Sequence, residues 1–457
     1  MSILSAEWTA ILYLIAAVCF ILALKGLSSP RAARRGNLIG AGGALLAIVT
    51  VFLSVKLDNI PAILIAIAVG SAIAAPIARR VQMTQMPQLV ALFNGVGGGA
   101  AALVAALELG HTANPWVRVA VVFTMLIGAV SFAGSAVTVA KLQELISTRP
   151  LVFAGMRWVM SAVLLAALLA CGFVISTGST GWAIAVLVLG LAAGLLLVLP
   201  VGGADVPIVI SLLNAFTGLA VAASGVVLDN VLLVVAGTLV GASGTILTRA
   251  MASAMGRGVS GILFGAFRGG STAGSTELSD RPVRSSGPED VAVLLGFAQR
   301  VVIVPGYGLA VAQGQHVIAE LATALESRGV DVVFAIHPVA GRMPGHMNVL
   351  LAEANVPYES LKEMTEVNPE FKNTDVALVV GANDVVNPAA KSSPGSPIYG
   401  MPILEVGDAS QVVFLKRSMR PGFAGIENEL LYDPKTALLF GDAKDSLTKV
   451  LGAVKAL

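Results

Sequence analysis

The chain changes character near Ser271, and this change limits its fold more than any other feature. Residues 1–255 form apolar runs of about 20 residues separated by short turns, whereas residues 290–457 alternate short β-rich runs with helical stretches. A composition of 56% hydrophobic and 12% charged residues is too apolar for an ordinary soluble protein. We therefore expect a polytopic α-helical membrane domain over 1–255, a flexible cytosolic linker over 256–289 and a soluble α/β domain over 290–457.

Nine apolar runs are long enough to cross a bilayer, whose core of about 30 Å requires roughly 20 helical residues. The runs are 8–27, 37–55, 60–78, 87–107, 117–140, 157–176, 182–200, 206–228 and 230–250. Twelve Lys and Arg residues fall in one set of alternate connections and two in the other. Because positive residues favour the cytosolic side, we expect the N-terminus outside and the C-terminal domain in the cytosol. An odd number of spans requires the same arrangement.

Polar side chains are few within these runs. They are Asn94, Ser131, Ser135, Thr138, Asn214 and Thr217. Ser131, Ser135 and Thr138 are spaced i, i+4, i+7 and therefore share one helix face. Two interpretations remain open for this face, namely hydrogen bonds between helices and a hydrated proton path. The glycines at 95 and 97–99 predict close contact between helices in the fourth run.

Asp205 is the only acid in the loop 201–207, which precedes the eighth run. An Asp before a first-turn Pro is typical of a helix N-cap. The residue is also expected at the cytosolic mouth of this span. The two roles are compatible.

The soluble part predicts a parallel, doubly wound, Rossmann-like sheet. Its β-rich runs are 301–304, 332–336, 376–380, 403–406, 412–415 and 437–440, with helices expected at 310–328 and 347–353. The first run leads into a dinucleotide fingerprint, Gly306-Tyr307-Gly308-Leu309-Ala310-Val311. Gly306 permits the tight turn and Gly308 allows backbone amides to approach a pyrophosphate, while Val311 stands where Gly or Ala is usual.

The end of the second β-rich run favours NADP over NAD. This run ends in Ile336-His337-Pro338, without the acid that usually binds the adenosine ribose. Lys416, Arg417 and Ser418 directly follow a later strand, and two cations with a hydroxyl suit a phosphomonoester. A solvated strand end is the alternative interpretation of that trio.

Several classes of ligand are not indicated by the sequence. The net charge is +2, and no basic patch with interleaved aromatic residues predicts nucleic acid binding. His337 and His346 have no acid or Cys partner at suitable spacing, so no metal site is predicted. The two cysteines lie far apart within apolar runs and predict no disulfide framework.

Six motifs resemble those of one membrane enzyme family, the β subunits of proton-translocating NAD(P) transhydrogenases. They are Met83–Pro87, Gly202–Pro207, Pro305–Gln313, His337–Asn348, Gly381–Asp384 and Lys416–Met419. The similarity extends over essentially the whole chain. It implies hydride transfer between NAD(H) and NADP(H), coupled to proton translocation across a bacterial-type inner (cytoplasmic) membrane. It also implies NADP(H) on this chain, NAD(H) on an α partner with additional membrane helices, and β homodimerisation within the complex.

The resemblance also implies roles for individual residues. The expected NADP(H) contacts are Tyr307, Val339, Ala340, Gly341, Arg342, Met343, Pro344, Gly381, Ala382, Asn383, Asp384, the segment 416–423 with Lys416, Arg417, Ser418 and Phe423, and Asp442 and Ala443, besides the fingerprint residues Gly306, Gly308 and Val311. Lys416, Arg417 and Ser418 would hold the 2′-phosphate. In this family the nucleotide lies reversed relative to ordinary Rossmann domains, so the fingerprint contact is expected to differ.

Two positions depart from the family pattern. Asn94 stands where some members have a membrane His thought to relay protons, and Phe423 where a Tyr is common. Since Asn does not titrate, a protonatable group must come from elsewhere, either from a partner's helix or from a water chain. For the second alternative, we expect Asn94 and Asn214 to hold a water path toward Asp205. The charge of Asp205 would then act on the loops around Asp384, a candidate for linking protonation to nucleotide state.

The alternative class is a nucleotide-gated channel or transporter with a cytosolic NADP-sensing domain. The sequence contains no TVGYG-type filter and no pair of intramembrane charges that indicates an ion site. Hydride exchange with an NAD(H)-binding domain would support the enzyme, and nucleotide binding alone would support the sensor.

Overall fold

The computed structural model describes residues 4–28, 30–54, 57, 59–82, 85–112, 114–147, 150–202, 205–254, 258–264, 281–341, 345–394, 396, 398–422 and 424–457. The chain divides into two compact units. The first comprises residues 1–200 and 209–248, and the second comprises residues 201–208 and 249–457.

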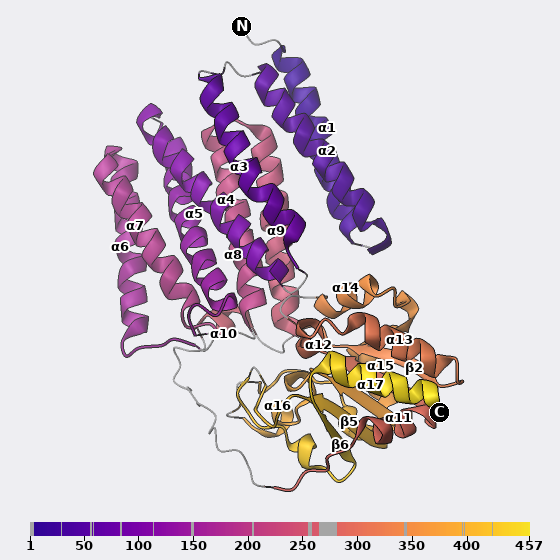
Figure 1. Ribbon diagram of the computed structural model, residues 1–457. Helices are drawn as coiled ribbons and strands as arrows, with labels where there is room; N and C mark the ends of the chain where they lie inside the picture. The colour runs from indigo at the N-terminus through magenta and orange to yellow at the C-terminus, as the bar shows by residue number, and fades with distance from the viewer. Residues whose placement is uncertain are drawn as a thin grey trace. The chain divides into compact units, whose positions relative to one another are not determined.

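Long helices build the first unit, and Figure 1 draws them from indigo to magenta. They are α1 (Ala6–Leu27), α2 (Pro30–Ser54), α3 (Ile60–Arg80), α4 (Met86–Glu108), α5 (Pro115–Leu142), α6 (Met156–Thr177), α7 (Thr180–Val198), α8 (Val206–Val227) and α9 (Val231–Ala254). Within the described part of the chain, these nine helices are long and apolar enough to cross a membrane. The nine predicted spans are therefore confirmed, with ends that differ by a few residues.

Small residues allow α4 and α5 to pack closely, as the glycines of the fourth run predicted. A Cβ added to Gly98 would lie 3.0 Å from the Ser131 Cβ, and one added to Gly95 would lie 2.9 Å from the Ser135 Cβ. On the α5 side of the same contact, a Cβ on Gly128 would lie 2.5 Å from the Gly98 carbonyl oxygen. Glycine on both helices thus brings the two backbones together, which is a common way to join helices in lipid.

A six-stranded parallel sheet forms the centre of the second unit. Its strands are β1 (Arg300–Pro305), β2 (Asp331–Ile336), β3 (Leu361–Glu363), β4 (Val376–Val380), β5 (Gln411–Lys416) and β6 (Thr436–Phe440), in the order β3-β2-β1-β4-β5-β6. The order reverses between β1 and β4, as in a doubly wound dinucleotide-binding sheet. This confirms the predicted fold class.

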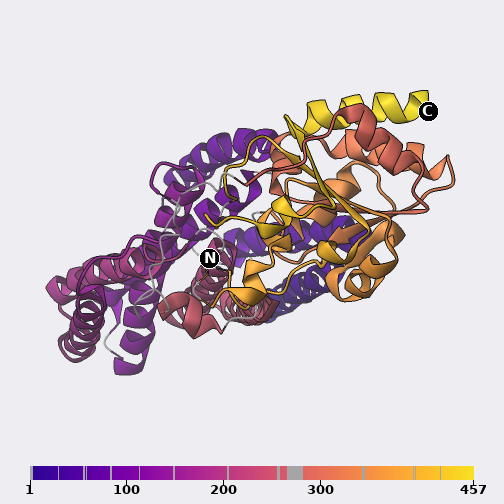
Figure 2. The same cartoon turned by 90° about the horizontal axis from the view of Figure 1, so that it is seen from below.

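Both faces of the sheet are covered. Val301 and Ile303 of β1 belong to the core beneath the longer helices, and Val302 and Val304 belong to the core of the opposite face. The helices of this unit are α10 (Val259–Phe264), α11 (Pro288–Gly296), α12 (Tyr307–Val311), α13 (Gln315–Glu326), α14 (His346–Glu353), α15 (Met364–Val367), α16 (Ala389–Ser392) and α17 (Ala443–Ala456). Figure 2 shows α17, in yellow, covering one face.

Two strand assignments from the sequence differ from the structure. The apolar segment 403–406 is not a strand, although Ile403, Leu404 and Val406 are buried. It runs as a buried loop into a 3-10 turn, because the backbone of Leu404 bonds to Val385 rather than to a strand. The sixth strand is β3, which has only three residues and two charges, and which pairs with β2.

Two further details refine the predicted boundaries. The helix expected at 310–328 is divided into α12 and α13, with Gln313 at a φ of +52° between them. Residues 281–289, which we assigned to the linker, are joined to the sheet: Ser285 pairs with Leu438 in parallel, and α11 begins at Pro288. Residues 265–280 lie outside the described part.

Candidate functional site

The predicted nucleotide residues converge because the strands are parallel. Residues 306–308 follow β1, 337–341 follow β2, 381–384 follow β4, 416–418 end β5 and 442–443 follow β6. The carboxyl ends of parallel strands share one edge of the sheet, where open α/β sheets bind ligands. Arg342, Met343, Pro344 and Phe423 lie outside the described residues.

The fingerprint glycines pack against the loop that follows β4. The N–H of Gly306 donates to the Val380 carbonyl at 2.9 Å, and the N–H of Gly308 donates to the Gly381 carbonyl at 3.1 Å. A Cβ on Gly308 would lie 2.7 Å from the Gly381 Cα, and Gly381 itself has a φ of +66°. The glycines therefore allow two backbones to meet where the strand order reverses, and the Gly308 amide is already donated to protein. Val311 ends the five-residue α12 with an exposed side chain.

A buried, neutral histidine fixes the loop after β2. His337 Nδ1 accepts from the Val339 N–H at 3.2 Å, so its Nε2 carries the proton and donates to the Pro402 carbonyl at 2.8 Å. Burial lowers the pKa of His337 to about 4, although the Pro402 bond opposes that shift. The ring of His337 thus holds the backbone of Val339, and the His337 carbonyl accepts from the N–H of Ala340.

The described end of this loop lies near the fingerprint. The ring of Tyr307 is 6.4 Å from the buried ring of His346, measured between centroids. Gly341 has a φ of +108°, and a Cβ there would lie 2.3 Å from His346 Nδ1. The loop thus needs glycine at 341 to pass the His346 ring. Among the described residues, no group of three His, Cys, Asp or Glu side chains is arranged to hold a metal.

Hydrogen bonds join the loop after β4 to the loop after β5. Lys416 Nζ donates to Asn383 Oδ1 at 2.9 Å, and Asn383 Nδ2 donates to Asp384 Oδ1 at 3.0 Å. Asp384 Oδ2 then accepts from the Ala424 N–H at 2.8 Å. Burial lowers the pKa of Lys416, and the Asp384 carboxylate opposes that shift. This Lys416–Asn383–Asp384 chain holds both loops in one arrangement.

The three residues expected to hold a 2′-phosphate differ in exposure. Arg417 and Ser418 are exposed, whereas Lys416 is half-buried and directed at Asn383. Arg420 is a further exposed cation in this loop, and its N–H donates to Ser418 Oγ at 3.4 Å. Arg420 lies within the segment 416–423 that the resemblance places around NADP(H), but sequence analysis assigned it no separate role at the phosphate.

Two buried asparagines also hold this edge and were missed. Asn387 Nδ2 donates to the Glu427 carbonyl at 3.0 Å, and Asn428 Nδ2 donates to the Asn383 carbonyl at 3.1 Å. Both side chains are buried. No sequence pattern distinguishes them from ordinary turn residues.

Asp442 lies at the start of α17. Its Oδ1 accepts from the N–H groups of Lys444 at 2.9 Å and Asp445 at 3.4 Å, so it caps the helix that begins at Ala443. The N–H of Gly441 donates to the Lys416 carbonyl at 2.9 Å. The loops after β5 and β6 are therefore joined as well.

In the helical unit, Asn94 forms the centre of a polar cluster from α4, α5 and α8. Its Nδ2 donates to Ser131 Oγ at 3.3 Å and Ser135 Oγ at 3.1 Å. Ser131 Oγ lies 2.6 Å from Thr217 Oγ1, which donates in turn to the Asn94 carbonyl at 3.3 Å. Asn94 Oδ1 is buried, and no donor among the described residues reaches it.

The other polar residues of the spans are arranged differently. Ser131, Ser135 and Thr138 are all buried on α5, and Thr138 donates to the Gly134 carbonyl of its own helix rather than taking part in the Asn94 cluster. Asn214 is half-buried and makes no hydrogen bond with Asn94 in the described structure. Asp205 is 9% exposed and directly precedes α8. The structure thus brings Asn94 together with two serines and a threonine rather than with Asn214.

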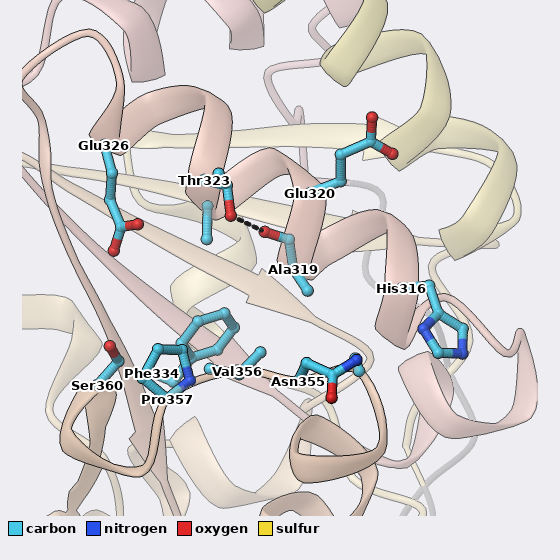
Figure 3. Close-up of a pocket in the computed structure, with 12 residues that line it drawn as sticks. His316, Ala319, Glu320, Thr323, Glu326, Phe334, Asn355, Val356, Pro357 and Ser360 are labelled. Carbon is cyan, nitrogen blue, oxygen red and sulfur yellow. Dashed lines mark hydrogen bonds between the residues drawn. The ribbon is translucent and has the colours of Figure 1, made fainter.

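A separate cavity of about 310 Å³ lies between α13 and the segment 354–360. Figure 3 shows His316 and Glu320 of α13 on one wall and Asn355 and Pro357 on the other. None of its twelve lining residues is a predicted nucleotide contact. The cavity is therefore distinct from the carboxyl edge of the sheet.

Comparisons with known proteins agree with this architecture over nearly the full chain. Residues 9–453 match the family model described as NAD(P) transhydrogenase beta subunit. The chain is also 46% identical to the NAD(P) transhydrogenase subunit beta of Rhodospirillum rubrum, over 97% of this chain and 98% of the relative. A protein of the same name from a named strain of that organism is also 46% identical, over the same shares of both chains. The chain therefore belongs to the family of NAD(P) transhydrogenase β subunits.

Proposed function

We propose that this chain is the NADP(H)-binding and proton-translocating subunit of a membrane transhydrogenase, which transfers hydride between NAD(H) and NADP(H). Residues 1–255 would form the membrane domain, 256–289 the connection and 290–457 the NADP(H) domain. The observation that carries the proposal is the convergence of predicted nucleotide residues after five parallel strands at one edge of the sheet.

The residues at this edge fit NADP(H). The exposed guanidinium groups of Arg417 and Arg420 flank Ser418, which suits a 2′-phosphate. After β2, the buried and neutral His337 holds its own loop through its hydrogen bonds to Val339 and Pro402. Bound NADP(H) would supply or accept the hydride. In this proposal Arg417 and Ser418 bind the phosphate, and Lys416 positions the loops through Asn383.

The proton path is proposed to begin at the Asn94 cluster. A buried acceptor such as Asn94 Oδ1 is costly unless a donor such as water reaches it. The cluster would therefore hold water, with Asn214 further along α8 and Asp205 toward the cytosolic end. Charge on Asp205 would bias the loops around Asp384 and so the affinity for NADP(H).

The complex is proposed to contain an α partner that carries the NAD(H) domain and additional membrane helices, with two β chains per complex. The proposed location is a bacterial-type cytoplasmic membrane, with the N-terminus outside and the NADP(H) domain in the cytosol. The distribution of Lys and Arg supports that orientation.

Reconstitution of the purified chain in liposomes tests the proposal. The chain alone should bind NADP(H) but transfer no hydride from NADH, because one fingerprint provides one nucleotide site. Addition of the α partner should produce hydride transfer together with proton movement. Robust turnover by the chain alone, or no binding of NADP(H), would contradict the proposal.

A further inference from the structure

Arg281 is the first described residue after 265–280, in the segment that connects the membrane helices to the nucleotide domain. Its guanidinium donates two parallel hydrogen bonds to the carboxylate of Glu429, at 2.9 and 3.1 Å. It also lies 4.0 Å from the ring centroid of Tyr432, and its Nη2 is 3.8 Å from Glu427. A bidentate pair and a cation–π contact together fix both the position and the orientation of a guanidinium group.

The backbone beside Arg281 is attached to the edge strand of the sheet. The N–H of Leu438 in β6 donates to the Arg284 carbonyl at 2.8 Å, and the N–H of Ser286 donates to the Leu438 carbonyl at 2.9 Å. The segment thus runs beside β6 like a short additional strand. Arg281 lies at the beginning of this attachment, on the side toward the membrane helices in sequence.

The partners of Arg281 belong to the segment 424–432, which also contacts the loop after β4. This segment bonds to Asp384 through the Ala424 N–H, to Asn387 through the Glu427 carbonyl and to the Asn383 carbonyl through Asn428. The hydroxyl of Tyr432 donates to Glu427. A single segment therefore contacts Arg281 on one side and the proposed nucleotide loop on the other.

We propose that Arg281 is a positioning residue for the nucleotide site. It fixes the segment 424–432, so that displacement of the connecting segment reaches Asn383 and Asp384 and changes the rate of NADP(H) release. This inference rests on the proposed function, because it concerns the regulation of the same site. It gives the connecting segment a mechanical role that a tether alone would not have.

An exposed ion pair usually contributes little to stability, so a matched pair is needed as a control. Lys455 of α17 and Glu320 of α13 form such a pair, with side chains 53% and 57% exposed, against 44% and 64% for Arg281 and Glu429. This control pair joins two helices, and among the described residues no hydrogen bond or ion pair links it to the segment 424–432. Loss of either pair should change the unfolding temperature by a similar amount. Only loss of the Arg281 pair should change the rate of nucleotide release.

The test uses the complete αβ complex in liposomes and compares the unmodified chain with Arg281→Ala, Arg281→Lys, Glu429→Gln and Lys455→Ala. NADPH release is measured by rapid displacement, and the unfolding temperature is measured for each variant. Arg281→Ala should speed release about tenfold, corresponding to loss of a charge-assisted pair. Arg281→Lys and Glu429→Gln should show a smaller change in the same direction, and Lys455→Ala should remain within about twofold of the unmodified complex.

The response to an imposed proton gradient separates positioning from a structural role. The gradient should change the release rate in the unmodified complex, and Arg281→Ala should reduce that response by at least about half. Release rates and gradient responses equal to those of Lys455→Ala would overturn the inference and leave the proposed function intact. Faster release in Arg281→Ala with a lowered unfolding temperature, and none in Glu429→Gln, would overturn it as well. Absence of NADP(H) binding by the unmodified complex would overturn both.

Discussion

The side chains of Asn94 in the helical unit and Asn428 in the α/β unit have different kinds of hydrogen-bond partner. In the helical unit, Asn94 bonds to the hydroxyls of Ser131 and Ser135 on a neighbouring helix. In the α/β unit, Asp384 and Asn428 instead bond to backbone groups of other loops. The difference follows from backbone chemistry, because a membrane helix satisfies its own N–H and C=O groups and a loop does not. Side-chain changes should therefore perturb a local cluster in the first unit and move whole loops in the second.

The largest expected effect tests the loop side of this comparison. Gly381→Ala should destabilise the α/β unit by about 3 kcal/mol or more, because the new Cβ would meet backbone that cannot turn away. That Cβ would lie 2.4 Å from the Gly308 Cα, at a φ of +66°. Urea-dependent proteolysis of the C-terminal unit measures the change. Gly452→Ala, which has open space in α17, is the control and should stabilise by about 0.5–1 kcal/mol.

A pH dependence should also belong to the α/β unit. The pKa of His337 is about 4 in the folded chain, against an ordinary value of 6.5, so the unfolded chain binds the proton between these values. Stability should therefore fall as pH falls from 6.5 to 4, by up to about 3 kcal/mol. His337→Gln should be less stable at neutral pH but should lose this slope in urea titrations at several pH values. A slope that persists in His337→Gln but disappears in the exposed His316→Gln would contradict the assignment.

Nucleotide choice should depend on the exposed cations of the β5 loop. Arg417→Ala should weaken binding of NADP⁺ by about 1.5–3 kcal/mol, through loss of a charge-assisted phosphate contact, and should leave NAD⁺ nearly unchanged. Calorimetric titration with both nucleotides measures the difference. Lys449→Ala, an exposed residue of α17, provides a control. Equal losses for the two nucleotides would mean that Arg417 is a solvated strand-end residue.

The smallest thermodynamic effect is expected in the helical unit. Ser135→Ala should lower stability by only about 0.6 kcal/mol, since polar contacts between membrane helices are weak on average. Asn94→Leu and Asp205→Asn should instead depress proton transport and the coupled reaction while NADP(H) binding is kept. Vesicle acidification and nucleotide titration provide the two readouts. Normal transport in both variants would make these residues packing and capping groups.

The parts of the fold that depend on local composition could be predicted. Length and hydropathy located the nine helices, and β-rich runs located β1, β2, β4, β5 and β6. β3 could not be found, because its three residues become a strand only by pairing with β2. Burial without pairing made 403–406 resemble a strand.

The loops that carry the site residues could also be predicted from the sequence, but the hydrogen bonds between them could not. Parallel strands predict which loops meet. They do not predict that Lys416 reaches across 33 positions to Asn383 rather than facing solvent. The buried amides of Asn387 and Asn428 were missed for the same reason, since their acceptors lie 40 and 45 positions away.

One contact in the helical unit bears on how the protein is made. Lys141, at the end of α5, is fully buried, and its Nζ donates to the carbonyls of Val198 and Leu199 where α7 ends. These carbonyls have no partner within α7. They are synthesised 57 and 58 positions after the amine that binds them. The Leu199 carbonyl also accepts from the Leu151 N–H at 3.0 Å. Because both donors precede α7 in the chain, we expect them to be synthesised before the carbonyls that they bind.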